Sequence, residues 1–309
     1  MLHALSGAAA AALGWGLTEA ARPRLRELEV ELPSLLPELD GLRIAHLSDF
    51  HFGVPSPGIG ATWQAAVWVR ERKPDLVAVT GDLLTHPRGE PMLRRLMRVL
   101  PQPTFAVLGN HDVRGVSDVG GALRAAGIRG SEAAHAVDLP GIRLVMGHSP
   151  VIGSHAGRLG SGHLDELVAL AGTSSPVAMV MHHPPRRLPV STVYPPGIVR
   201  RDSARLVRGL QEANPSVVML AGHTHRNRLY RVGGIPVAEV GSTKDFPGQW
   251  AGYTVYEGGL RQVVRRTARP DVIAWTEMTG TALGGVWRRW SPGSIGDRCW
   301  SVEWAAGGI

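Results

Sequence analysis

Short clusters of carboxylate, imidazole and amide side chains recur along this chain, each directly after a run of apolar residues. Such groups bind first-row transition metals through nitrogen and oxygen. Mixed ligation of this kind suits Mn, Fe, Zn, Co or Ni, and does not suit Ca or Mg, which prefer oxygen alone. In chain order the clusters are Asp49-Phe50-His51, Gly81-Asp82, Gly109-Asn110-His111-Asp112, Met181-His182-His183-Pro184 and Gly222-His223-Thr224-His225.

The position of the clusters predicts that they meet in space. In open α/β sheets, functional groups gather at the loops that leave the carboxyl ends of strands. In an extended loop, residues i and i+2 point the same way, so Asp49 with His51, and His223 with His225, should each present two ligands to one place. The carboxylate of Asp82 has two oxygens and could bridge two cations.

Enough ligands are present for two metal ions. The expected chemistry follows from the presence of two ions instead of one. Two ions about 3.5–4 Å apart can hold a bridging hydroxide and clamp the phosphate oxygens of an in-line displacement. Coordination lowers the pKa of bound water, so the nucleophile exists near neutral pH. The pattern therefore predicts phosphoester hydrolysis.

The elements that must position these residues alternate between strand and helix. Short runs rich in Val, Ile or Leu predict buried strands, and the segments between them favour helices. Alternation of this kind indicates layered α/β structure, and Gly-rich turns near 233 and 258 add an antiparallel portion. The predicted strands are 42–47, 76–79, 104–108, 142–146, 177–181, 217–220, 236–240 and 253–256, and the predicted helices are 61–71, 92–99, 119–126, 164–171 and 203–212.

The ordered series DxH, GD, GNHD, HHP and GHTH resembles the calcineurin-like metallophosphoesterase superfamily. The resemblance implies a four-layer α/β/β/α sandwich of two mixed sheets flanked by helices. It also implies that His111 contacts the phosphate and assists the leaving group, while Asp112 orients His111 through a hydrogen bond. The implied ligands are Asp49, His51, Asp82 and His225 for one metal, and Asp82, Asn110, His182 and His223 for the other.

The substrate is less closely defined by these residues. A phosphodiester is the first choice, because a positioned His111 suits protonation of a poor alkoxide leaving group. A cyclic nucleotide is one candidate. Phosphomonoesters and membrane-lipid phosphoesters are alternatives, and a non-catalytic interaction module on the same fold is an alternative of another class.

Other residues near the motifs compete for a role at the site. His148 and His183 could replace a predicted ligand. Arginines after the HHPP and GHTH motifs could pair with phosphate oxygens or simply face solvent. The loop 184–200 and the segment 244–247 could shape the pocket. The residues concerned are Arg186, Arg187, Tyr194, Arg226, Arg228 and Lys244-Asp245-Phe246-Pro247.

Composition limits the partners and the compartment. With 309 residues, 44% of them hydrophobic, the chain can bury a large core. Its net charge of +7 comes from scattered arginines, with no basic block interleaved with aromatic residues, so no nucleic-acid partner is expected. Cys299 is the sole cysteine, which excludes an intrachain disulfide and fits a reducing, cytoplasmic compartment. The oligomeric state is left open.

Three domains are predicted along the chain. Residues 1–28 form an apolar N-terminal segment, residues 29–266 the metallophosphoesterase domain, and residues 267–309 a Trp-rich extension that packs on the body. The apolar stretch 2–17 is shorter than the roughly 20 residues that span a bilayer. It predicts either a helix packed on the body or association with the inner face of the membrane.

Overall fold

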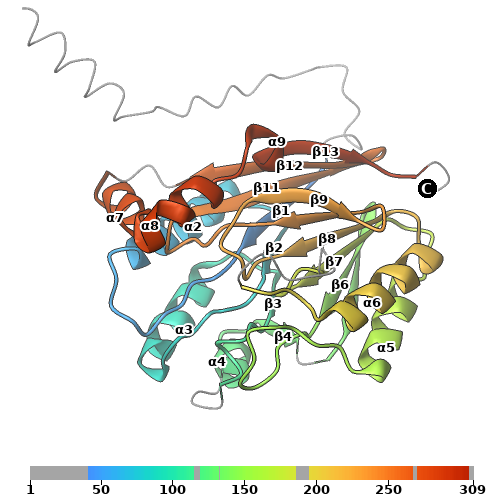
Figure 1. The fold of residues 1–309 in the computed structure, drawn as a ribbon, viewed down its shortest axis with the longest axis horizontal. Helices are drawn as coiled ribbons and strands as arrows, with labels where there is room; N and C mark the ends of the chain where they lie inside the picture. Colours follow the sequence, from blue (N-terminus) through green and yellow to red (C-terminus); the bar gives the residue numbers. More distant parts are fainter. Residues whose placement is uncertain (1–40, 115–118, 132, 186–194, 267–269, 306–309) are drawn as a thin grey trace, which may run out of the picture.

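The computed structural model describes residues 41–114, 119–131, 133–185, 195–266 and 270–305 (Figure 1). The predicted N-terminal segment 1–28, including the stretch 2–17, lies outside the described residues, as do Arg186, Arg187 and Tyr194. Among the helices that the structure does describe, none is long and apolar enough to cross a membrane. Membrane association and a cytoplasmic location stay predictions.

Two mixed sheets form the centre of the described structure. In the first, β1 to β4 are parallel and β11 to β13 are antiparallel to their neighbours. Its order is β13 (Cys299–Glu303), β12 (Gly259–Arg266), β11 (Gln249–Tyr256), β1 (Leu42–Leu47), β2 (Leu76–Val79), β3 (Thr104–Val107) and β4 (Arg129–Ser131).

The second sheet has a parallel centre with an antiparallel strand at each edge. Its order is β5 (His135–Leu139), β6 (Ile142–Gly147), β7 (Val177–Met181), β8 (Val217–Ala221), β10 (Ile235–Glu239) and β9 (Arg228–Val232).

Helices cover the outer face of each sheet, which confirms the predicted four-layer sandwich (Figure 1). The helices α2 (Ile59–Arg72), α3 (Glu90–Val99) and α4 (Val119–Ala125) pack on the first sheet. The helices α5 (Ser161–Ala171) and α6 (Arg200–Ala213) pack on the second. The remaining elements are the short 3₁₀ turn η2 (Pro87–Gly89) and the C-terminal helices α7 (Pro270–Gly280), α8 (Ala282–Trp290) and α9 (Ile295–Arg298).

Alternate residues of each central strand enter different hydrophobic cores. In β2, Leu76 and Ala78 face the second sheet, whereas Val77 and Val79 face the helices. Similarly, Leu220 of β8 lies between the sheets. Because both faces of these strands are buried, their sequences are continuous apolar runs instead of alternating ones.

The sequence missed several elements that lack such a run. The strands β4, β5, β9, β12 and β13, and the helices α7, α8 and α9, were not predicted. The strand predicted over 253–256 begins four residues earlier, at Gln249. The predicted domain boundary between 266 and 267 stays a prediction; β13, beyond it, pairs with β12 in the first sheet.

We expect that Leu144→Ala lowers the free energy of unfolding by about 2–5 kcal/mol, because it leaves a cavity between the two sheets. Leu144 is fully buried there. Denaturant unfolding measures the change, with Met92→Ala as a matched control because Met92 is 37% exposed. Equal stability of the two variants would contradict the packing of the two sheets against each other.

Candidate metal centre

The predicted site residues lie in five loops at the carboxyl ends of β1, β2, β3, β7 and β8. Backbone hydrogen bonds hold these loops together. The Asp49 N–H donates to the Gly81 carbonyl (3.0 Å), the His51 N–H to the Asp82 carbonyl (2.9 Å), and the Gly222 N–H to the His182 carbonyl (3.1 Å). The sandwich therefore brings residues that are far apart in the sequence to one place.

Most of the predicted ligands have a left-handed backbone. Six described residues other than glycine have positive φ, and five of them are predicted ligands. A left-handed conformation is uncommon for residues other than glycine and is often found at functional sites. The five are Asp49 (φ 58°), His51 (45°), Asp82 (52°), His223 (69°) and His225 (53°).

This conformation corrects the expectation of extended loops. The side chains of Asp49 and His51 do converge, at 3.7 Å between Oδ1 and Nε2, but the backbone turns between them. His223 and His225 do not present ligands to one place: each lies in a different cluster of donor atoms. The predicted pairing was wrong for His223 and His225, because it assumed a strand geometry that these turns do not have.

The first cluster joins β1 to the loop after β8. The Nε2 atoms of His51 and His225 are 3.1 Å apart, and Nε2 of His225 is 3.3 Å from Oδ1 of Asp49. Oδ2 of Asp82 lies 3.6 Å from Nε2 of His51. Four donor atoms from three loops thus face one point.

The second cluster is centred on His182. Its Nε2 is 3.1 Å from Nδ1 of His223 and 3.2 Å from Oδ1 of Asn110. It is also 3.4 Å from Oδ1 of Asp82. Asp82 therefore contributes one carboxylate oxygen to each cluster, and its side chain lies between them.

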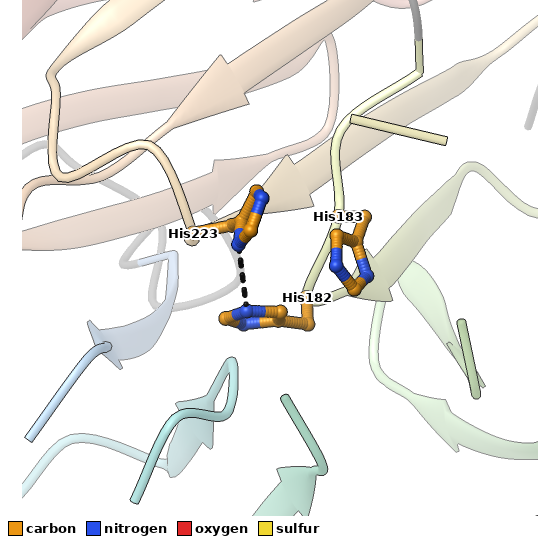
Figure 2. A group of neighbouring side chains, drawn as sticks. All are labelled: His182, His183 and His223. Carbon is orange, nitrogen blue, oxygen red and sulfur yellow. Dashed lines mark hydrogen bonds between the residues drawn. The ribbon is translucent and has the colours of Figure 1, made fainter. Parts of the chain in front are cut away.

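His183 occupies a different position from His182 (Figure 2). Its ring stands beside that of His223, with 4.3 Å between centroids, and its Nδ1 is 2.9 Å from Oγ of Ser149. A ring nitrogen of His183 could still join His182 and His223 around one ion, since one donor from each lies within 4.8 Å of the others. Of the two consecutive histidines, His182 is the one against Asp82.

The donor atoms fit bound metal ions. Zinc–nitrogen and zinc–oxygen bonds are about 2.0–2.2 Å, so two donors on one ion lie roughly 3–3.5 Å apart. The donor pairs within the two clusters are close to this range, at 3.1 to 3.7 Å. Oδ1 of Asp49 is buried and accepts no hydrogen bond from the residues that the structure describes. Two unprotonated ring nitrogens 3.1 Å apart, like those of His51 and His225, would repel each other without a shared cation or a proton.

The far side of each ring has its own hydrogen-bond partner. Nδ1 of His182 donates to the Thr80 carbonyl (2.6 Å), and Nε2 of His223 donates to the Pro196 carbonyl (3.1 Å). Bonds of this kind place the proton on the outer nitrogen and leave the inner one free to bind metal. The carbonyl of Pro196 also gives the 184–200 loop a contact with the site.

The negative charge of the buried carboxylates and the protonation of the neighbouring histidines depend on each other. Burial alone would raise the pKa of Asp82, but His182 and His51 outweigh it and hold that pKa well below its usual range. Burial lowers the pKa of His182, but the carboxylates of Asp82 and Asp49 overcome this and raise it to about 9. The buried carboxylates therefore need positive charge beside them, from protons or from metal.

Asp112 does not orient His111, which corrects the predicted role. Its Oδ1 accepts from the backbone N–H groups of Leu83 and Leu84, both at 2.9 Å, and its Oδ2 from that of Gly109 at 2.8 Å. The turn after β3 directs this carboxylate towards the loop after β2 and away from the His111 ring. Asp112 thus joins two ligand loops.

His111 lies at the edge of the site with a partner that the sequence analysis missed. Its Nε2 is 3.9 Å from Oδ2 of Asp82, and the guanidinium of Arg114 donates to that nitrogen at 3.2 Å. Burial, together with the nearby cationic groups, outweighs Asp82 and lowers the pKa of His111 to about 4. In the sequence, this contact could have been inferred from the basic residue three positions after His111.

Three further candidates take other places. Arg226 is buried and stacks on two tryptophans, so it does not face solvent. Oδ2 of Asp245 is 4.0 Å from Nδ1 of His225. His148 was considered a rival ligand. Its backbone N–H donates to Nε2 of His163, a residue outside the two clusters.

Comparison with known proteins agrees with this geometry. The family model described as calcineurin-like phosphoesterase matches residues 42–227, from β1 to the end of the GHTH loop. The chain belongs to this family. The two His/Asp clusters are the groups that could hold metal ions.

Two curated relatives are identical to this chain at about a quarter of the aligned positions. A transmembrane protein with metallophosphoesterase domain from Danio rerio is 26% identical over 70% of this chain, and the matched part covers 48% of that protein. A probable cyclic nucleotide phosphodiesterase from Rhodococcus erythropolis is 27% identical over 65% of this chain and 70% of its own. The match thus spans about half the length of the first relative.

Solved structures share the fold at low identity. A dimetal phosphatase from Danio rerio superimposes with a TM-score of 0.56 at 13% identity, covering 74% of this chain and 97% of its own. A purple acid phosphatase from yellow lupin gives 0.52, also at 13%, covering 72% and 51%. At this identity the likeness is one of architecture.

We expect metal binding to release at least one proton at pH 7. His182, with a pKa raised to about 9, is protonated at that pH in the metal-free protein, and a ligand nitrogen must lose its proton. Affinity for Mn²⁺ should therefore rise with pH towards 9. Calorimetric titration in two buffers of different ionisation enthalpy counts the protons, and release of none would contradict His182 as a ligand.

We expect that Gly109→Ala lowers metal affinity, because a Cβ at this position would overlap the Oδ1 of Asp82. Gly160→Ala is the matched control, since nothing lies within 4 Å of its added Cβ. Metal content after gel filtration distinguishes the two variants. Full metal occupancy in both would show that the close approach of Gly109 to Asp82 does not matter for the site.

Proposed function

We propose that the protein is a phosphodiesterase that binds two divalent transition-metal ions, with Asp82 between them. The observation that carries the proposal is the division of the Asp82 oxygens between the clusters of His51 and His182. Mn, Fe and Zn all suit the donor set. Asp49, His51 and His225 would complete one site, and Asn110, His182 and His223 the other.

Bound at these positions, two ions would supply Lewis acidity to polarise a phosphoryl group and to lower the pKa of water. The protein's own contribution is orientation. The left-handed turns hold donor atoms inward, and the outer hydrogen bonds of His182 and His223 fix their ring tautomers. Burial of Asp49 and Asp82 keeps water from competing for their oxygens.

His111 is proposed to act on the leaving group. Its side chain is 21% exposed, more than those of the buried ligands, so a substrate could reach it. The ring is uncharged at neutral pH because burial lowers its pKa to about 4. A phosphate anion beside the ring would raise that pKa. The protonated Nε2 would then donate a hydrogen bond to the leaving oxygen or transfer its proton to it. Arg114 adds positive charge at the same place.

A cyclic nucleotide is the proposed substrate class. The relative from Rhodococcus erythropolis carries that activity in its name, and the leaving group of a cyclic phosphodiester is a poor alkoxide of the type that needs His111. The net charge of +7 favours anionic substrates in general.

The direct test is hydrolysis of a chromogenic phosphodiester and of the corresponding monoester by the manganese-loaded protein, with a chelator and Asp82→Ala as controls. Metal-dependent turnover that favours the diester supports the proposal. Turnover that favours the monoester would make the protein a phosphomonoesterase. Bound metal with no turnover of either ester would favour the non-catalytic alternative.

We expect that His111→Ala keeps its metal but loses about 10²–10⁴-fold in rate with alkyl diesters, whose leaving groups need protonation. The loss should be smaller with nitrophenyl diesters. His86→Ala, an exposed histidine outside the clusters, is the control. An equal loss for both kinds of ester, accompanied by loss of metal, would contradict a role on the leaving group.

A further inference from the structure

The C-terminal helices are attached to the loop that carries His223 and His225. The Asn227 N–H donates to the Ser291 carbonyl at 2.9 Å, and the Leu229 N–H donates to Oδ1 of Asp297 at 2.9 Å. Gly293 allows this approach, since a Cβ there would overlap the Asn227 carbonyl. These elements lie beyond the residues 42–227 matched by the family model.

A second attachment lies on the other side of His225. The Phe246 N–H donates to Oγ1 of Thr279 in α7 at 3.1 Å. The ring of Phe246 packs against Gly280, whose added Cβ would lie 2.9 Å from that ring. The segment containing Asp245 and Phe246 is therefore held by α7, while the GHTH loop is held by α8 and the residues after it.

Between these attachments, α8 places an indole beside the metal centre. The ring of Trp287 lies 6.3 Å from that of His225, between centroids, with 33° between their planes. The guanidinium of the buried Arg226 stacks on Trp287 at 5.0 Å and on Trp290 at 5.3 Å. Arg226 thereby fixes α8 against the ligand loop, and Trp287 is left half-buried.

The exposure of the clusters shows where a substrate can enter. The side chains of Asp49 and His182 are fully buried, whereas those of His111 and His225 are 21% and 22% exposed. The open part of the centre therefore includes His111 and His225. Trp287 borders the opening at His225.

We propose that Trp287 is a specificity residue of the substrate pocket. It contacts the group that stays on phosphorus, and it favours a planar aromatic group such as a nucleobase. The inference rests on the proposed function, because it assigns His111 to the leaving group. Indole rings bind flat apolar groups well, and stacking on an aromatic side chain typically strengthens binding several-fold to about a hundredfold.

The test compares binding of phenyl phosphate and methyl phosphate to the manganese-loaded protein by calorimetry. The wild type should bind phenyl phosphate about tenfold more tightly. Trp287→Ala should lose that preference while its affinity for methyl phosphate stays unchanged, and Trp287→Phe should keep most of it. In kinetics, the same variants should change KM for aryl diesters more than kcat.

Trp290→Ala is the matched control, because Trp290 also stacks on Arg226 and no contact joins its ring to His225 among the described aromatic pairs. It should keep the preference for phenyl phosphate. Equal effects of the two alanine variants would mean that both tryptophans only support Arg226, and this would overturn the proposal. Equal binding of both esters by the wild type would overturn it as well. Failure of the wild type to bind either ester would overturn the proposed function itself.

Discussion

Two buried carboxylates at the carboxyl ends of adjacent strands are the constraint on which the site depends. Asp49 and Asp82 are 0% and 2% exposed, and isolated charges at such depth would be very unfavourable. Four imidazoles and an amide surround them at distances suited to sharing cations. The surrounding structure serves to hold these groups in place.

The two-sheet architecture makes this convergence possible. Asp49, Asp82 and Asn110 follow strands of the first sheet, whereas His182 and His223 follow strands of the second. The clusters therefore lie where the two sheets meet, and the apolar packing between the sheets fixes their separation. Thr80 follows β2 of the first sheet and His182 follows β7 of the second, and the Thr80 carbonyl accepts a hydrogen bond from Nδ1 of His182.

Much of this could be predicted from the sequence. Buried parallel strands are continuous apolar runs, which can be recognised in the sequence. Five of the eight predicted strands are of this kind and are followed by the loops that contain the predicted ligands. The edge strand β9, and β12 beside the edge strand β13, contain several arginines and gave no such signal. The ligand set rested on the ordered motifs, which preserve residue type and spacing. It remains a prediction, although the structure brings all seven residues together.

The errors arose where side-chain direction depends on local backbone geometry. Asp112 was expected to touch His111, but the turn after β3 points its carboxylate at backbone N–H groups. Arg226 was expected near phosphate or in solvent, yet two tryptophans from more than 60 residues later cover it. Neither outcome can be inferred from spacing, because each depends on contacts between segments distant in the chain.

We propose that seven side chains hold two ions, with Asp82 between them. The most direct measurement is anomalous diffraction at the manganese edge from crystals of the manganese-loaded protein. We expect two peaks, one beside His51 and His225 and the other beside His182 and His223, each in contact with one oxygen of Asp82. A single peak, or two peaks that do not share Asp82, would contradict it.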